Sequence, residues 1–136
     1  MKKQLAAVTV ALACAGMAWA AGVVTPDQLA SEKARKLVQG REAGPPEECL
    51  RVTPRTKLRI VDPSVVVAYD SVSRFNVNLV APGCTALQED RIIMIDMDRR
   101  RICAGDVFGV ADLRTGIQYG SCRWGQFIPF TRVKAD

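Results

Sequence analysis

From about residue 49 to the C-terminus, short runs rich in β-branched and other apolar residues are separated by turn residues at close intervals. This spacing is typical of strands connected by tight turns. Because no helical interval separates the runs, they predict an all-β domain of about six antiparallel strands, folded as a small barrel or sandwich. The seven runs lie at residues 58–61, 65–69, 74–80, 91–97, 102–111, 117–122 and 126–133, and the first three are expected to form a meander.

Upstream of this domain the apolar positions follow helical spacing. Thr25 and Pro26 suit the start of a helix, and Gly40 suits its end. The pattern predicts one short amphipathic helix, which docks on a membrane or partner, lies on its own domain, or frays in solvent. Its apolar stripe is Leu29, Ala30, Ala34, Leu37 and Val38, and its charged back is Glu32, Lys33, Arg35 and Lys36.

Residues 41–48 contain two prolines and a glycine but no large apolar side chain, a composition typical of a linker. We therefore expect residues 21–48 to form a helix and linker that precede a folded domain at residues 49–136. The four cysteines of this domain, described below, are expected to stabilise its small core.

The N-terminal residues 1–20 have the three regions of a secretory signal peptide. Lys2 and Lys3 precede an apolar run at residues 5–13, and Ala18-Trp19-Ala20 is a small-residue cleavage site. This predicts a periplasmic or secreted protein cleaved after Ala20. The alternative is a weak lipobox, Ala11-Leu12-Ala13-Cys14, which would anchor a lipoprotein through Cys14. The apolar run is far shorter than the ~20 residues that cross a bilayer, so we expect no membrane span.

Composition narrows the possible functions. The formal charge is +5, and removal of Lys2 and Lys3 with the leader lowers it by two. A mildly basic exported chain is not expected to bind nucleic acid. The sequence has no histidine, which removes the commonest general base and the Ser-His and Cys-His nucleophile pairs. We therefore expect a protein that is not an enzyme and that holds neither cofactor nor metal.

The expected mature chain has four cysteines, Cys49, Cys84, Cys103 and Cys122, an even number that predicts two disulfides in an oxidising compartment. A zinc site is the alternative, but there is no close Cys-x-x-Cys pair. Four cysteines allow three pairings. If the strands close into a barrel, the first and last strands meet, which favours Cys49 with Cys122 and Cys84 with Cys103.

The sequence around the cysteines resembles a family of small secreted bacterial proteins of unknown function, DUF6491. The resemblance covers residues 49–133 and leaves out the helix and linker. It implies export, two disulfides and a single domain, but no activity, ligand or cofactor. Trp124 stands where similar sequences are expected to have leucine. The segments that carry the resemblance are Cys49-Leu50, Pro82-Gly83-Cys84 with Leu87, Ile102-Cys103-Ala104-Gly105-Asp106, and Cys122-Arg123-Trp124-Gly125-Gln126-Phe127.

Basic residues form the first candidate site. Arg55, Lys57 and Arg59 alternate with Thr56, Leu58 and Ile60, so the three cations are expected on one face of a strand. Arginine side chains match phosphate and carboxylate geometry, and Arg99, Arg100 and Arg101 could extend the face. It could bind lipid phosphates, anionic glycans or acidic partners, or it could be a solvated face whose charges protect a sheet edge.

Carboxylates form the second candidate site. Asp96 and Asp98 share a strand face, with Asp106 and Asp112 a strand away, an arrangement that could serve glycoside hydrolysis or hold a divalent cation. The alternative gives them structural roles, with Asp98 paired to the following arginines and Asp106 and Asp112 bonded to backbone amides in turns. Three aromatic residues near Cys122 are expected to cover the disulfide or, alternatively, to line a groove: Trp124, Phe127 and Phe130.

These observations favour an exported, non-catalytic domain that binds an unidentified anionic envelope component or protein partner through Arg55, Lys57 and Arg59. One alternative is a carboxylate-dependent hydrolase built from Asp96, Asp98 and Asp106. Another is a purely structural envelope protein, in which the N-terminal helix covers the face of residues 55–59. Neither the oligomeric state nor the docking of the helix follows from the sequence.

Overall fold

The computed structural model describes residues 29–134. The predicted cleavage after Ala20, the lipobox at Cys14 and the helix start at Thr25 lie outside the described residues. Within residues 29–134 no helix combines the length and the hydropathy of a membrane span.

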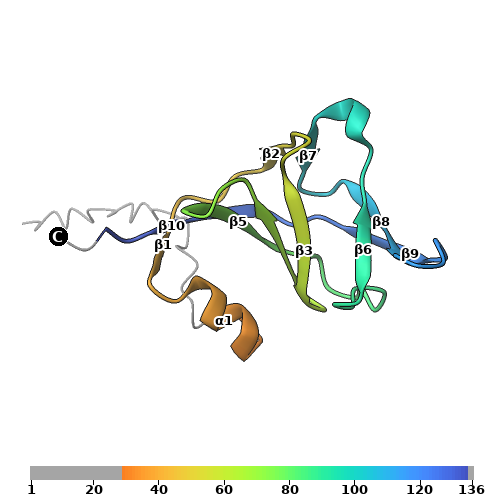
Figure 1. The fold of residues 1–136 in the computed structure, drawn as a ribbon, viewed down its shortest axis with the longest axis horizontal. Coiled ribbons are helices and arrows are strands. Elements are labelled where there is room, and N and C mark those ends of the chain that lie inside the picture. Colours follow the sequence, from red (N-terminus) through yellow and green to blue (C-terminus); the bar gives the residue numbers. More distant parts are fainter. Residues whose placement is uncertain (1–28, 135–136) are drawn as a thin grey trace, which may run out of the picture.

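The central layer is a five-stranded antiparallel sheet in the order β1-β10-β5-β4-β3 (Figure 1). β3, β4 and β5 follow one another along the chain and form the predicted meander. β3 is an edge strand of this sheet and lies beside β6 of a neighbouring sheet. The five strands are β1 (Arg41–Ala43), β3 (Lys57–Asp62), β4 (Val65–Tyr69), β5 (Arg74–Leu79) and β10 (Phe127–Arg132).

Two smaller antiparallel sheets pack against one face of the central sheet. One joins β2 (Cys49–Arg51) to β7 (Arg101–Cys103), and the other has the order β6-β8-β9. The prediction of a mostly antiparallel β fold with one short helix is confirmed, but the described strands form three sheets and no closed barrel. The strands of the third sheet are β6 (Arg91–Met94), β8 (Val107–Asp112) and β9 (Gln118–Arg123).

Two of the predicted strands end earlier than expected. The run at residues 102–111 is divided into β7 and β8 at Gly105, whose φ of 88° lies in the left-handed region that favours glycine. The run at residues 91–97 ends at Met94, and a one-turn 3-10 helix, Met97–Arg99, follows it. The alternation of Ile95, Asp96 and Met97 hid the end of β6, whereas the turn at Gly105 is the one in which Asp106 was predicted to bond to a backbone amide.

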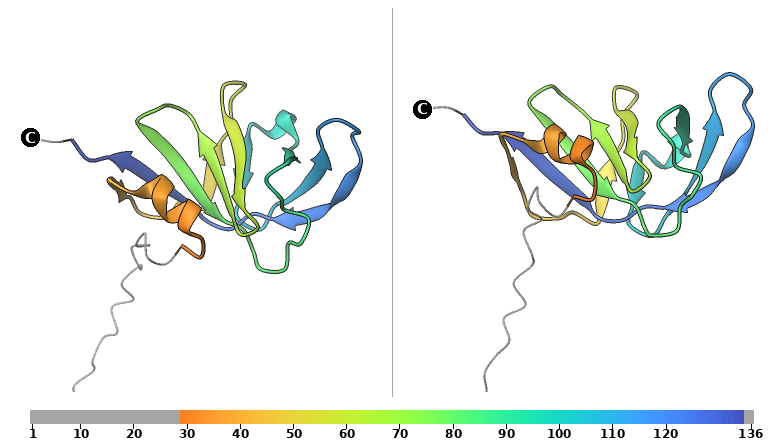
Figure 2. Two further views of the ribbon diagram at one scale, coloured as in Figure 1. Left: turned by 60° about the horizontal axis from the view of Figure 1, so that its bottom comes forward. Right: turned by 90° about the horizontal axis from the view of Figure 1, so that it is seen from below.

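The one α-helix among residues 29–134, α1 (Glu32–Val38), starts later than predicted and leaves Leu29 and Ala30 before it. Ser31 caps it, and Ser31 Oγ accepts a hydrogen bond from the backbone N–H of Ala34 at 3.0 Å. Ser31 Oγ also donates to the Asp62 carboxylate at the end of β3. Ala34 and Val38 are buried against the central sheet, on the face opposite the small sheets (Figure 2). The helix therefore lies on its own domain.

The prediction of a linker at residues 41–48 is wrong. β1 pairs with β10 in this segment, and Glu47 forms an isolated bridge with Phe127. The guanidinium group of Arg41 donates to the carbonyl oxygens of Ser73 and Val72, both at 3.1 Å. β1 is an edge strand, where neighbouring prolines interrupt no ladder, and their presence therefore did not exclude a strand.

The four cysteines form two disulfides, Cys49–Cys103 and Cys84–Cys122. The predicted pairing of Cys49 with Cys122 and of Cys84 with Cys103 is wrong. It assumed that the first and last strands meet in a closed barrel. Instead β2 pairs with β7, and Cys49 stands directly opposite Cys103 in that two-stranded ribbon.

Two hydrophobic cores lie on opposite faces of the central sheet. Trp124 belongs to the core under the small sheets, and its ring centroid lies 4.1 Å from that of Phe108 and 5.6 Å from that of Phe127. Phe130 belongs to the core under α1. All three aromatics are core residues as predicted, and Trp124 and Phe127 share the core of Cys122. The prediction that Phe130 covers this disulfide is wrong, because it lies in the core on the other face of the sheet.

Candidate functional site

The candidate site is the basic surface formed by Arg55, Lys57 and Arg59. Lys57 and Arg59 are exposed on β3, while the alternating Ile60 is buried in the core below. This is the strand periodicity expected from the sequence. Because β3 is an edge strand, the two cations stand at the margin of the central sheet.

Arg55 differs from the prediction in its place in the fold, because it precedes β3 and lies in a turn. Thr53 Oγ1 accepts a hydrogen bond from the backbone N–H of Arg55 at 3.3 Å, and the carbonyl of Thr53 accepts from Thr56 at 3.0 Å. The Arg55 side chain is exposed. It therefore extends the basic surface beyond the end of the strand without sharing the strand's face.

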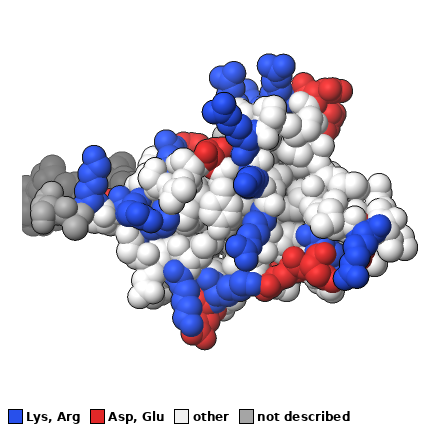
Figure 3. Space-filling view, in the orientation of Figure 1, with Lys and Arg blue, Asp and Glu red and all other residues white. Residues whose placement is uncertain are grey.

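The basic surface continues onto α1, as the band of Lys and Arg side chains over β3 and toward α1 shows (Figure 3). Arg59 shares a shallow cleft of about 300 Å³ with Lys33, Lys36 and Tyr69. Lys33 pairs with Glu89, and Lys36 pairs with Glu32 at 2.9 Å. α1 therefore borders the basic surface and adds cations to it, and it leaves Lys57 and Arg59 exposed.

Arginines also gather at the β2–β7 ribbon. Arg51 and Arg101 stand directly opposite each other in the ribbon. The backbone N–H of Val52 donates to the carbonyl of Arg100 at 2.9 Å, which brings the 3-10 helix beside the segment that leads to Arg55. Arg100 lies beside the segment that leads to Arg55, but Arg99 and Arg101 line a cleft with Asp96 and Asp106, so the extension of the basic surface by Arg99, Arg100 and Arg101 stays a prediction. Arg51 is a further arginine of the ribbon that sequence reasoning missed.

Among residues 29–134, no ion pair includes the three cations that define the basic surface, whereas Lys33 and Lys36 on α1 are paired with glutamates. The structure of residues 29–134 contains three ion pairs, Lys33 with Glu89, Lys36 with Glu32, and Arg74 with Glu47. None of the three includes Arg55, Lys57 or Arg59. Like charges without partners repel one another at close range, and an external anion would relieve that repulsion.

The predicted carboxylates do not gather at one place. Asp96 and Asp106 line a cleft of about 290 Å³ that also includes Arg99, Arg101 and Trp124, whereas Asp112 lies at the turn between β8 and β9. Within the described residues, no group of three or more Cys, Asp or Glu side chains could hold a metal ion, and the predicted pairing of Asp98 with the arginines is not formed.

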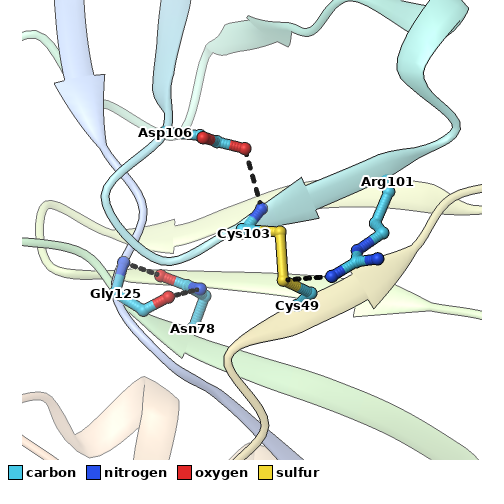
Figure 4. Close-up of a disulfide and its surroundings, with 6 residues drawn as sticks. All are labelled: Cys49, Asn78, Arg101, Cys103, Asp106 and Gly125. Atoms are coloured by element: carbon cyan, nitrogen blue, oxygen red, sulfur yellow. Dashed lines mark hydrogen bonds between the residues drawn. A yellow bond between two sulfur atoms is a disulfide. The ribbon is translucent and has the colours of Figure 1, made fainter.

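Each carboxylate that bonds to backbone amides stabilises a turn. Asp106 Oδ2 accepts from Cys103 N–H at 2.9 Å, as its predicted turn role requires (Figure 4). Asp96 Oδ1 accepts from Asp98 N–H at 3.0 Å and caps the 3-10 helix. Asp112 Oδ1 accepts from Arg114 N–H at 2.7 Å and from Thr115 N–H at 3.0 Å, which confirms its predicted turn capping.

The hydrogen bonds at the Asp112 turn lead to a prediction about the titration of this carboxyl group. Hydrogen bonds from the backbone N–H groups of Thr115 and Arg114 lower the pKa of the Asp112 carboxyl below its ordinary value of 3.8. A lowered folded-state pKa contributes stability above the unfolded-state pKa, and this contribution is lost as the pH falls through the folded-state pKa. A carboxyl-detected NMR titration should give an Asp112 midpoint below 3.8, and a midpoint at or above 3.8 would contradict this account of the turn.

Comparison with other proteins adds no identification. No family model, curated protein or solved structure matches this chain. The resemblance of the cysteine segments to DUF6491 therefore stays a prediction.

Proposed function

We propose that the protein is an exported, non-catalytic domain that binds anionic phospholipid headgroups of the cell envelope through the basic surface of Arg55, Lys57 and Arg59. The observation that carries the proposal is three exposed cations with no ion pair among residues 29–134, flanked by further lysines and arginines. Two disulfides suit an oxidising compartment outside the cytoplasm. We also propose membership of DUF6491 on the cysteine segments.

Edge protection alone accounts for only part of this surface. Charges on β3 would discourage pairing with another strand, but the cations continue onto α1 and the β2–β7 ribbon, neither of which is that edge. The purely structural alternative required the helix to cover residues 55–59, and α1 leaves Lys57 and Arg59 exposed. Cations without an ion pair among residues 29–134 on both β3 and the β2–β7 ribbon therefore support ligand binding over edge protection alone.

The hydrolase alternative receives less support. Asp96 and Asp106 share a cleft, but the side chain of each accepts a backbone hydrogen bond that shapes a turn. Those bonds give both carboxylates a structural role of the kind common for aspartate in turns. We therefore base the proposed function on the cations.

Charge reversal at the basic surface should abolish lipid binding. A cation near an anionic lipid surface contributes about 1 kcal/mol, so loss of three cations should weaken binding by about 100-fold, and their replacement by anions should weaken it further. Co-sedimentation with vesicles of phosphatidylglycerol and phosphatidylcholine would measure the effect in the variant Arg55→Glu, Lys57→Glu, Arg59→Glu.

The matched control reverses the same number of charges at exposed sites outside the basic surface, with Arg114→Glu, Arg132→Glu and Lys134→Glu. This control should bind the mixed vesicles much more tightly than the basic-surface variant, and both should keep the wild-type far-UV circular dichroism spectrum. Equal loss in the two variants would show that net charge and not this surface determines binding. Wild-type binding to pure phosphatidylcholine vesicles at the same strength would also contradict the proposal.

A further inference from the structure

The two disulfides differ in their surroundings. Cys122 is a core residue that is 5% exposed, and Cys84 packs against the same core. Cys49 and Cys103 are both partly exposed and stand directly opposite each other in the β2–β7 ribbon. Both sulfurs of the Cys49–Cys103 bridge are therefore open to a thiol from solution, whereas in the other bridge only Cys84, beside a cleft of about 210 Å³, is partly exposed.

A cation contacts only one sulfur of this bridge. Arg101 Nη2 lies 3.2 Å from Cys49 Sγ and points at it (Figure 4). A guanidinium group remains charged at every physiological pH, and a neighbouring cation stabilises a cysteine thiolate. Cys49 is consequently the better leaving group of the pair, because exchange is faster when the departing thiol has the lower pKa.

We propose that Cys49–Cys103 is a site of thiol–disulfide exchange, at which the thiolate of an anionic low-molecular-weight thiol attacks Cys103 Sγ. A new S–S bond forms between that thiol and Cys103 as the Cys49–Cys103 bond breaks. The electron pair of the broken bond goes to Cys49 Sγ, which leaves as a thiolate beside Arg101. The product is one mixed disulfide and one thiolate, and no net oxidation takes place.

The surroundings also favour an anionic thiol over a neutral one. Arg51 lies opposite Arg101 in the same ribbon, and Arg100 is the residue before Arg101. The carboxylates of Glu48 and Asp106 also lie near the bridge, but the three arginines outnumber them, so the net positive charge attracts an anion and raises its local concentration. The ribbon should stay in place after exchange, because Leu50 and Ile102, which pair between the two strands, are buried in the core. The proposal does not depend on the lipid-binding function.

The experiment exposes the folded, oxidised protein to reduced glutathione and then blocks free thiols with iodoacetamide before peptide mapping. We expect glutathione on Cys103, the alkyl group on Cys49, and an intact Cys84–Cys122 bridge. Arg101→Gln should slow the reaction by about three- to tenfold, because it removes the charge that stabilises the departing Cys49 thiolate. Unfolding the protein in urea should make both bridges reactive, which validates the detection.

Arg51→Gln is the matched control, because it removes one charge from the same ribbon without removing the contact with Cys49 Sγ. It should slow the reaction less than Arg101→Gln does. The proposal is overturned by glutathione on Cys49, by first reaction at Cys84 or Cys122, by equal rates for the two variants, or by no adduct in the folded protein under conditions that label the unfolded one.

Discussion

Replacement of Gly125 by alanine should destabilise the domain by about 3 kcal/mol or more, because the backbone has no space for a Cβ there. An ideal Cβ would lie 2.0 Å from the carbonyl oxygen of Leu79, and relief of that contact requires the chain to move. The movement would break two hydrogen bonds of the buried Asn78 side chain, in which Nδ2 donates to Gly125 O at 2.7 Å and Oδ1 accepts from Gly125 N–H at 3.0 Å (Figure 4).

Urea unfolding followed by far-UV circular dichroism would measure the loss of stability in Gly125→Ala. Gly109→Ala on β8 is the matched control, because the nearest atom to its Cβ is the flexible end of Met94, at 3.0 Å. We expect a change of about 1 kcal/mol or less for this control, since a flexible side chain can move aside. If the two variants unfold at the same urea concentration, the close approach of Gly125 to Leu79 does not constrain the fold as described.

Truncation of Trp124 to alanine should lower the free energy of unfolding by about 3–5 kcal/mol, which is the usual range for removal of a buried aromatic side chain. Trp124 is 2% exposed, and its ring packs between Phe108 and Phe127 in the core under the small sheets. A loss of this size is a large part of the total stability of a small domain, about 5–15 kcal/mol. The expected result is a folded but much less stable variant.

Trp124→Leu provides the comparison, because leucine keeps an apolar side chain at this position. Leucine is also the residue expected here in the family that the cysteine segments resemble. Trp124→Leu should lower the free energy of unfolding clearly less than Trp124→Ala does, since a smaller cavity remains. Urea unfolding of both variants tests this difference. An equal loss would mean that the core depends on the indole ring itself and that filling part of its volume does not help.

Much of the β fold could be predicted from the sequence because its signals are local. Val65–Tyr69 was predicted with its observed bounds, since its β-branched run is bordered on both sides by turn residues. The turn roles of Asp106 and Asp112 were also predicted, because they depend on backbone amides within three residues. Arrangements that involve only near neighbours in sequence are readable in this way.

The remaining features depend on which distant strands pair. The Cys49–Cys103 disulfide follows from the pairing of β2 with β7, and spacing along the chain does not specify that pairing. The same holds for the approach of Lys33 to Arg59, which requires α1 to dock on the central sheet. Lys33 was recognised as part of a charged helix face, but its place beside the basic surface carried no signal in the sequence.

A second exposed surface makes the location of lipid binding a decisive question. The hairpin of β8 and β9 exposes the apolar residues Leu113, Ile117 and Tyr119, and exposed apolar residues can also contact a membrane. This hairpin lies at a different end of the molecule from α1 and β1 (Figure 1). If lipid binds through the hairpin, the cations over β3 are not the main contact with the membrane.

An amide NMR titration with short-chain phosphatidylglycerol tests the central claim most directly, because it locates the contact residue by residue in the unmodified protein. The account predicts that the largest shifts fall on residues 55–59 and extend to Lys33 and Lys36, that they weaken as salt is added, and that phosphatidylcholine does not reproduce them. Largest shifts at residues 113–119, or equal shifts with both lipids, would contradict it.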